Sequence, residues 1–321
     1  MFQSIWDDVK REFGYGNMVT RIIILNVAVF VVVHLVNFGI FLYYGGAPDK
    51  SYPVFQKFLH FFCMSSDWRY LLTHPWVLFT SMFLHEGFWH ILWNMLFLYW
   101  FGRIVGDFIG NQRVLPIYLL GGLAGAILFF LSANLLHYGQ YGGGGVFALG
   151  ASAGVMAIVV AAGAISPDYI MRLLFLGDVK LKYIVGVLVL LDVIGIGNNL
   201  NTGGHFAHLG GAFFGWLFVF QLRNGADWAQ PVNSVLDGIV NFFRRLFSGE
   251  LQRRGPKVAY RNPSRERFQR ERESRRGNAA SDSAYRNYQE QLDAILDKIK
   301  ESGYESLSES EKEFLFNASK K

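Results

Sequence analysis

Cysteine and charge are scarce in this sequence. Of its 321 residues, one is a cysteine, Cys63, and 17% are charged, while 52% are apolar. A single cysteine excludes an internal disulfide bond and any metal site built from several cysteines. The charged fraction lies below the roughly 25% of an average soluble protein, and the apolar residues are concentrated in the first two-thirds of the chain. These properties are typical of a membrane protein that crosses the bilayer several times.

Apolar stretches separated by polar turns predict the membrane spans. The clearest one, residues 145–165, contains no Asp, Glu, Lys or Arg and is long enough to cross a bilayer as a helix. We expect six spans, at about residues 21–44, 89–103, 115–136, 145–165, 183–197 and 204–222. The predicted fold class is therefore all-α, a polytopic bundle of six transmembrane helices. The first apolar run follows a charged stretch and is too long for the core of a signal peptide, so we expect no removable signal peptide.

The basic residues of the loops predict the orientation. One set of loops, together with the basic C-terminal tail, carries Lys10, Arg11, Arg21, Arg103, Arg113, Arg172, Lys180, Lys182 and Arg223. The opposite set carries only Lys50, Lys57 and Arg69. Because positively charged loops stay on the cytoplasmic side, we expect a protein of the cell (inner) membrane with both termini in the cytoplasm. The second, fourth and sixth spans then begin at the outer face.

Polar side chains gather near the starts of these three spans. His90 and Asn94 are four residues apart and share one face of the second span, while Ser152 lies in the fourth span and His208 in the sixth. Polar groups inside a membrane are costly, which makes them candidates for function. Their positions predict a similar depth, roughly 10 Å below the outer surface at a rise of about 1.5 Å per residue. A histidine beside a serine can act as its general base.

Pairs of glycines predict which helices touch. Gly150 and Gly154 flank Ser152, and Gly211 and Gly215 have the same spacing on the sixth span. Small residues four positions apart let membrane helices approach closely. We therefore expect the fourth and sixth spans to pack together and to bring the serine hydroxyl to the histidine ring. The histidine and asparagine of the second span, with the serine backbone N–H, can then stabilise an oxyanion.

With these motifs the chain resembles the rhomboid intramembrane serine proteases over about residues 21–223. The resemblance rests on three patterns, His90-x-x-x-Asn94, Gly150-x-Ser152-x-Gly154 and Ala207-His208-x-x-Gly211-x-x-x-Gly215. It implies a serine endopeptidase of the bacterial type that cleaves transmembrane segments of single-span proteins. The implied site is a dyad in which Ser152 is the nucleophile and His208 the base and then the acid, with His90 and Asn94 stabilising the oxyanion. No metal or cofactor and no nucleic acid are expected, and the expected partners are transmembrane substrates and the lipid bilayer.

Two positions differ from some members of that family. Met156 stands where some members have a tyrosine that stacks on the catalytic histidine, and Trp76-Val77 stands where some have Trp-Arg. A thioether can pack on an imidazole, so we expect altered geometry at Met156 rather than inactivity. The polar stretch at residues 198–201 is expected to lie above the serine and to admit water.

Three further ionisable residues are assigned to structure. His205 shares a helical face with His208 but lies closer to the surface, and His85 is expected to tether the first loop. Asp192 lies near the outer end of the fifth span. We expect it to form a structural hydrogen bond with neighbouring backbone, which leaves the serine and histidine without an acidic third member.

The main alternative function is that of a catalytically weak or inactive rhomboid-like protein that binds membrane helices. Such relatives typically lack the serine or the histidine, and both are present here. A membrane metalloprotease would need His-Glu-x-x-His. His85 and His90 are one residue too far apart to share one helical face in that way.

The chain divides into four predicted segments. Residues 1–20 form a cytoplasmic N-terminus and residues 21–224 the six-span domain. Residues 225–248 carry an apolar stripe beside two arginines, which is typical of an amphipathic helix at the membrane interface. Residues 249–321 form a basic linker and a small helical tail, in which Ser308-x-x-Glu311 has the spacing of a capping box.

Overall fold

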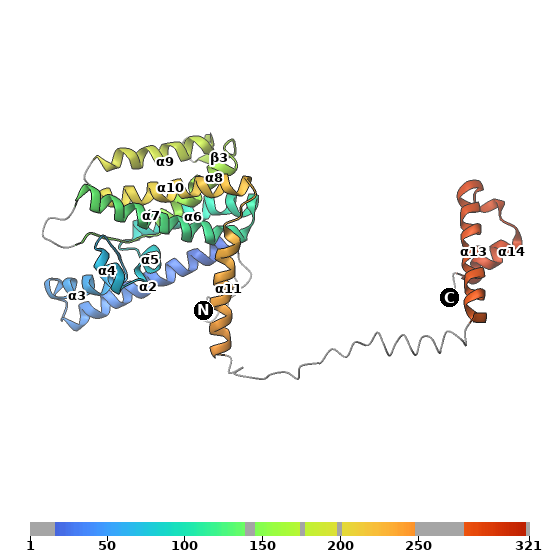
Figure 1. Cartoon of the computed structure of the whole chain (residues 1–321), viewed down its shortest axis with the longest axis horizontal. Coiled ribbons are helices and arrows are strands. Elements are labelled where there is room, and N and C mark those ends of the chain that lie inside the picture. The colour runs from blue at the N-terminus through green and yellow to red at the C-terminus, as the bar shows by residue number, and fades with distance from the viewer. Residues whose placement is uncertain (1–16, 139–144, 174–176, 198–200, 248–278, 319–321) are drawn as a thin grey trace. The chain divides into compact units, whose positions relative to one another are not determined.

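The computed structural model describes residues 17–138, 145–173, 177–197, 201–247 and 279–318. The chain divides into two compact units, residues 1–247 and 248–321 (Figure 1). The predicted charged N-terminal stretch before residue 17, the polar stretch at 198–200 and most of the basic linker lie outside the described residues.

The first unit is built from long helices. They are α2 (Met18–Tyr43), α6 (Phe88–Ile109), α7 (Val114–Leu136), α8 (Ser152–Ile165), α9 (Leu181–Ile196) and α10 (Thr202–Arg223) (Figure 1). Each predicted apolar stretch overlaps one of these helices. Two segments of 26 residues, Met18–Tyr43 and Asn111–Leu136, are long and apolar enough to cross a membrane, with mean hydropathies of 2.4 and 2.3, and α8 is apolar but shorter. The protein is therefore mostly helical over its described residues, as predicted.

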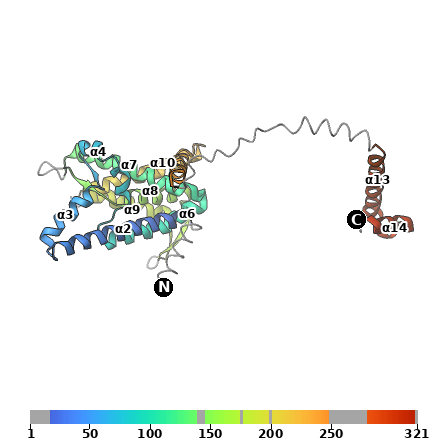
Figure 2. The same cartoon turned by 90° about the horizontal axis from the view of Figure 1, so that it is seen from below.

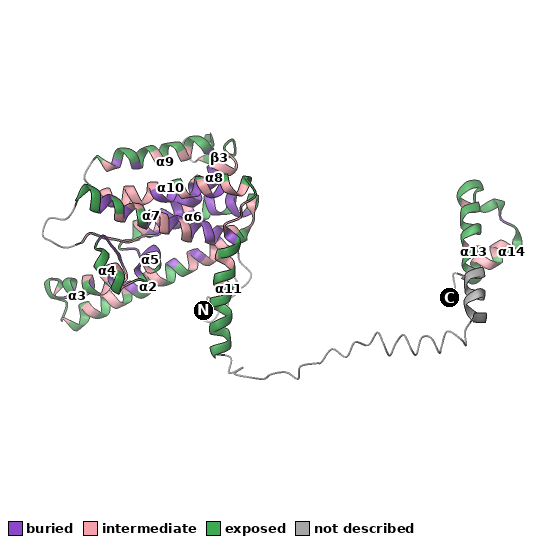
Figure 3. Cartoon of the chain, viewed as in Figure 1, coloured by how far each residue is buried: buried purple, intermediate pink, exposed green. Residues whose placement is uncertain are grey.

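Apolar side chains cover much of the outside of the first unit. On α2, Val32 and Leu35 are 58% and 62% exposed, and on α9, Leu190 and Leu191 are 55% and 57% exposed. In Figure 3 α9 lies at the edge of the bundle and is coloured mostly as exposed. Helices that are apolar on their outer as well as their inner faces are typical of contact with lipid.

Helix α8 is the centre of the first unit and packs against α6, α7, α9 and α10. Its residues Ala157, Ile158, Ala161 and Ala162 are fully buried. Helix α10 approaches it closely, because a methyl group placed on Gly211 or Gly215 would collide with the backbone carbonyls of Ala153 and Ala157. Small residues on both helices therefore set the separation of their axes.

The two glycines around Ser152 have a different role from the one predicted. Gly154 faces α7, where an added Cβ would lie 2.6 Å from the backbone oxygen of Tyr118. Gly150 lies before the helix, and an added Cβ there would meet the ring of His90 on α6. The prediction that both glycine pairs join the fourth and sixth spans is thus correct for Gly211 and Gly215 and wrong for the pair around the serine.

Helix α8 also begins later than predicted. Residues 147–148 form strand β2 (Phe147–Ala148), which pairs antiparallel with β1 (Met64–Ser65). At Gly150 the backbone takes φ of 133° and its N–H donates to the Ser81 carbonyl at 2.9 Å. Glycine adopts this positive φ without a steric penalty. Ser152 is therefore the first residue of α8 instead of lying a third of the way into a longer helix.

The segment between α2 and α6 is folded. It contains α3 (Pro48–His60), α4 (Trp68–Thr73), α5 (Val77–Thr80) and the short 3₁₀ helix η1 (Ser81–Phe83), and Figure 2 shows it at one end of the bundle. The indole N–H of Trp76 donates to the Phe61 carbonyl at 2.8 Å. Val77 is fully buried and packs in a cluster with Met64 and Phe129. Residue 77 therefore contributes to the core of this segment.

The other end of the first unit carries a hairpin and a further helix. Strands β3 (Ile170–Leu173) and β4 (Gly177–Lys180) pair antiparallel between α8 and α9. Helix α11 (Ala229–Phe247) follows α10. Just before it, Asp227 forms an ion pair of 2.8 Å with Arg113 at the start of α7. This partly buried pair fixes the beginning of α11 against the bundle.

The second unit is a helical hairpin. It consists of α13 (Ala279–Ser302), η3 (Tyr304–Ser306) and α14 (Glu309–Ala318). The predicted capping box is present, since the Ser308 backbone N–H donates to Glu311 Oε2 at 2.7 Å. This hydrogen bond, with the contact to Lys298, lowers the pKa of Glu311 to about 2. Glu311 therefore caps the start of α14 and, through Lys298, also joins α14 to α13.

Candidate active site

The first candidate residue, Ser152, lies at the N-terminus of α8 on the wall of a cavity. The turn at Gly150 directs the chain into the helix, and the neighbouring Ala151 is almost fully buried. The first N–H groups of a helix have no carbonyl partner within it. A serine at this position therefore has its hydroxyl next to backbone donors that favour negative charge.

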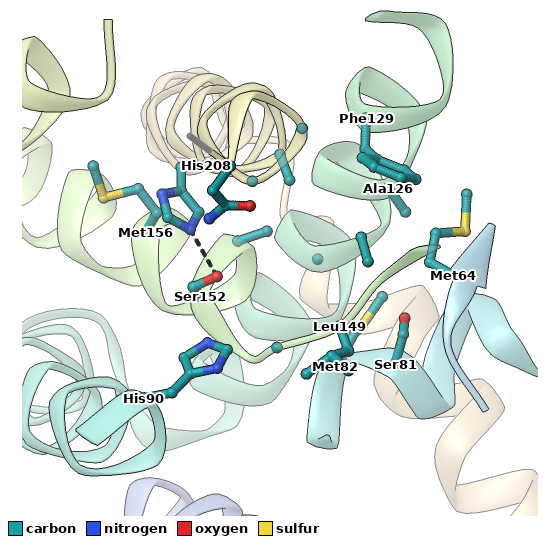
Figure 4. Close-up of a pocket in the computed structure, with 18 of the residues that line it drawn as sticks. Met64, Ser81, Met82, His90, Ala126, Phe129, Leu149, Ser152, Met156 and His208 are labelled. Carbon is teal, nitrogen blue, oxygen red and sulfur yellow. Dashed lines mark hydrogen bonds between the residues drawn. The ribbon is translucent and has the colours of Figure 1, made fainter. Parts of the chain in front are cut away.

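His208 comes from α10 and meets the serine. Its Nε2 lies 2.7 Å from Ser152 Oγ, which is a hydrogen-bond distance (Figure 4). The close approach of α10 to α8 at Gly211, one turn further along, makes this contact possible. In Figure 4 Met156 lies beside His208, on the same helix as the serine. The predicted meeting of Ser152 and His208 is present in the structure.

The position of Asp192 differs from the one predicted from the sequence. Its Oδ1 lies 2.7 Å from Nδ1 of His208, where we expected a hydrogen bond with backbone and no carboxylate near the histidine. The side chain is 10% exposed and also accepts a hydrogen bond from His205 Nδ1 at 2.8 Å. A donor on Nδ1 leaves Nε2 of His208 free to accept the serine proton. The three side chains thus form a continuous chain, Ser152–His208–Asp192.

His90 and Asn94 face the same cavity from α6. The His90 ring packs against Gly150, where an added Cβ would be 3.0 Å from His90 Nε2 and 3.6 Å from Ser152 Oγ. Any side chain at residue 150 would therefore occupy the space between ring and hydroxyl. Asn94 is nearly buried, and its Nδ2 donates to the His90 carbonyl at 2.9 Å. One of its two amide N–H donors is therefore engaged within its own helix.

The cavity itself has a volume of about 1420 Å³ and is bounded by α6, α7, α8, α9, α10 and the β1–β2 pair. Of the described residues that line it, none is Lys or Arg, whereas Glu86 and Asp192 are acidic. Cys63 also reaches its wall, and burial raises the pKa of that thiol to about 12. A thiol that stays protonated is a poor nucleophile, so the serine is the better candidate.

His85 lies behind the site. It is fully buried, and its ring is edge-on to that of His90 with centroids 5.0 Å apart. His85 is thus in contact with the candidate oxyanion residue, and its role as a tether of the first loop stays a prediction. The partnership of Asp192 with His205 and His208 was not predicted, because both Asp192 and His205 were assigned to structure. The sequence shows only an aspartate and a histidine in neighbouring apolar helices. It does not show the direction in which either side chain points.

The fold and the site together define a helical membrane protein with a serine and a histidine facing one cavity. Residues 72–225 match the Rhomboid domain family, and residues 283–321 match a family of unknown function (DUF6576). Residues 72–225, just under half of the chain, are therefore similar to the rhomboid domain, and proteins with this domain include serine proteases.

Three relatives indicate the distance within the family. RHOMBOID-like protein 7 of Arabidopsis thaliana is 27% identical over 246 residues, 68% of this chain and 71% of that protein. RHOMBOID-like protein 12, mitochondrial, from the same plant is 31% identical over 157 residues, 46% of each chain. Rhomboid protease GluP of Bacillus subtilis (strain 168) is 30% identical over 161 residues, 50% of this chain and 29% of that protein. The chain thus spans less than half the length of the last two relatives.

Proposed function

We propose that this protein is an intramembrane serine endopeptidase that cleaves transmembrane segments of single-span membrane proteins. The observation that carries the proposal is the hydrogen-bonded chain in which 2.7 Å separates Ser152 Oγ from His208 Nε2 and 2.7 Å separates His208 Nδ1 from Asp192 Oδ1. Nucleophile, base and orienting group lie in the mutual geometry that acyl transfer requires. Three different helices supply them, and the most exposed of the three side chains is only partly accessible.

The proposed reaction begins when Ser152 Oγ attacks the carbonyl carbon of the substrate peptide bond. Its proton moves to His208 Nε2, and Asp192 stabilises the imidazolium that forms. The negative charge develops on the carbonyl oxygen, where the backbone N–H of Ser152 and the side chains of His90 and Asn94 are the proposed donors. One N–H of the Asn94 amide already donates to the His90 carbonyl, so its second N–H is the proposed donor to the oxyanion. His208 then protonates the leaving amine, and water hydrolyses the acyl-enzyme in the same way.

The cavity suits an unwound segment of a membrane helix. An intact helix hides each carbonyl in a hydrogen bond, so a substrate must expose its backbone before the serine can attack. The space next to the hydroxyl is narrow, because a single Cβ on Gly150 would already lie 3.0 Å from His90 Nε2 and 3.6 Å from Ser152 Oγ. We therefore propose substrates with small residues at the cleaved bond. The second candidate, an inactive helix-binding relative, uses the same cavity without the reaction.

A purified-protein assay on a single-span reporter tests the role of Asp192. The variant Asp192→Asn keeps the shape of the side chain but removes the charge, so we expect kcat to fall about 100-fold with little change in KM. The matched control is Asp107→Asn, an exposed aspartate on α6, which should cleave as wild type does. If the wild-type protein is folded and cleaves none of several reporters, the helix-binding function is favoured instead.

The proposed topology places six spans in the cell membrane, with both termini in the cytoplasm. It is supported by the arginines and lysines at the hairpin end of the bundle and by the apolar helices. Residues 225–248 are proposed to lie along the inner surface, and residues 249–321 to follow in the cytoplasm. Exposed apolar residues on α11, among them Ile239 and Phe243, support this interfacial position.

Labelling of introduced cysteines tests the orientation. Arg69 on α4 and Arg172 on β3 are both exposed, and the native Cys63 is buried. We expect a membrane-impermeant maleimide to label Arg69→Cys in intact cells and Arg172→Cys only after the membrane is opened. The opposite pattern would show that the termini are outside.

A further inference from the structure

Asp192 has more partners than the proposed reaction uses. Its Oδ1 accepts from Nδ1 of His208 at 2.7 Å and from Nδ1 of His205 at 2.8 Å. His205 is three residues before His208 on α10 and makes no contact with Ser152 that the mechanism needs. One carboxylate held between two imidazoles therefore remains to be explained.

The fold makes room for the second imidazole. A Cβ placed on Gly195 of α9 would overlap the His205 ring, so only glycine allows the ring to lie against that helix. The ring then points toward Asp192, which belongs to the same helix as the glycine. His205, His208 and Asp192 each offer one ligand atom, and these atoms all lie within 4.8 Å of one another. Helices α9 and α10 thus supply all three ligand atoms and leave room for the second ring.

This donor set is one that divalent transition metals prefer. Two imidazole nitrogens and one carboxylate oxygen, with a fourth position for water, form a common zinc coordination shell with metal–ligand distances of about 2.0–2.2 Å. Nδ1 of each histidine already lies at hydrogen-bond distance from Asp192 Oδ1. Small side-chain rotations would therefore be enough for the three atoms to surround an ion. The cavity beside them carries Glu86 as a second carboxylate, and no Lys or Arg occurs among its described lining residues. The field in the cavity therefore favours cations.

We infer that Asp192, His205 and His208 form a binding site for a divalent transition-metal ion of the zinc type, and that binding there switches the serine off. The second half of this inference rests on the proposed protease function, whereas metal binding itself does not.

The inhibition follows from the tautomer of His208. Without metal, the Nδ1 proton is donated to Asp192 and the lone pair on Nε2 faces Ser152 Oγ. A metal bound to Nδ1 needs the lone pair of that nitrogen, so the neutral ring carries its proton on Nε2. Nε2 then cannot take the serine proton. The bound cation also opposes formation of an imidazolium at the same ring.

Calorimetric titration with Zn²⁺ tests the binding step without any cleavage. The protein is Ser152→Ala in detergent micelles, which keeps all three proposed ligands, and it is compared with Ser152→Ala/His205→Ala. Groups that only support a metal ligand already change affinity by about 10- to 100-fold, so removing a ligand should weaken binding by at least that factor. The matched control is His137→Asn, a cavity histidine with φ of 56°, a conformation that asparagine tolerates. We expect this control to bind zinc as the parent does.

Cleavage assays test the inhibitory step. Each variant is compared with its own activity in the presence of a chelator, so that any change in basal rate cancels. Zinc should inhibit the wild-type protein and His137→Asn reversibly and should inhibit His205→Ala at least about tenfold less. Equal zinc inhibition of all three would overturn the assignment of the site. Absence of zinc binding by Ser152→Ala would overturn the inference even if the protein proves to be a protease, and binding without any protease activity would retain the metal site alone.

Discussion

Replacement of Ser152 by alanine is expected to abolish cleavage while the protein remains folded. The hydroxyl is the only proposed nucleophile, and loss of a serine nucleophile typically lowers kcat by about four to six orders of magnitude. The substitution removes one oxygen from the partly exposed start of α8, and alanine is compatible with that position. The thermal midpoint in detergent should therefore stay close to that of wild type. The measurement is initial rate on a single-span reporter with purified protein.

Ser81→Ala is the matched control for this loss. Ser81 also lines the cavity, but it is its backbone carbonyl, and not its hydroxyl, that holds the Gly150 turn. This variant should retain cleavage. A fluorophosphonate probe should label wild type and Ser81→Ala and leave Ser152→Ala unlabelled. Cleavage retained by Ser152→Ala would show that another group is the nucleophile, and the hydrogen-bonded chain would then need a different function.

The largest loss of stability is expected at the contact between α8 and α10. The variant Gly215→Leu would place a side chain against the backbone carbonyl of Ala157, which cannot move away without displacing the helix. Overpacking typically costs about 1–3 kcal/mol and occasionally more, and a collision with backbone argues for about 3 kcal/mol, the upper end of that range. For a domain of this size that cost lowers the thermal midpoint by about 6 °C or more. Because the same contact brings His208 to Ser152, activity should be lost with it.

Gly186→Leu is the corresponding control. Gly186 is also in a helix, α9, but nothing lies within 4 Å of an added Cβ. The leucine should even favour the helix slightly, since glycine costs about 1 kcal/mol in a helix interior. Thermal unfolding of both variants in the same detergent separates the effect of packing from that of helix propensity. Equal midpoints for the two variants would mean that the glycine contact does not set the helix separation.

The sequence by itself determined the helices and the pair of residues at the site. Runs without charge leave a chain few options except helices that satisfy their own backbone in lipid. The positions of Ser152 and His208 at matching ends of such runs followed from length and spacing alone. The glycines of α10 were also readable, because residues 211 and 215 share one face of a helix whatever it packs against.

Only the tertiary structure determined which residues surround Ser152 and His208. The pairing of β1 with β2 joins residues about 80 positions apart, as in the hydrogen bond from Val146 N–H to Ser66 Oγ. Because residues 147 and 148 belong to this pair, α8 begins only at Ser152. The direction of the Asp192 side chain depends on how α9 turns against α10, and helical periodicity gives a face but not a neighbour. Gly154 likewise packs against α7. Several apolar faces of α8 have similar hydropathy, so only the three-dimensional packing determines which face contacts which helix. Long-range contacts between separate helices carry no local pattern, and so the carboxylate of the site became visible only when the helices were assembled.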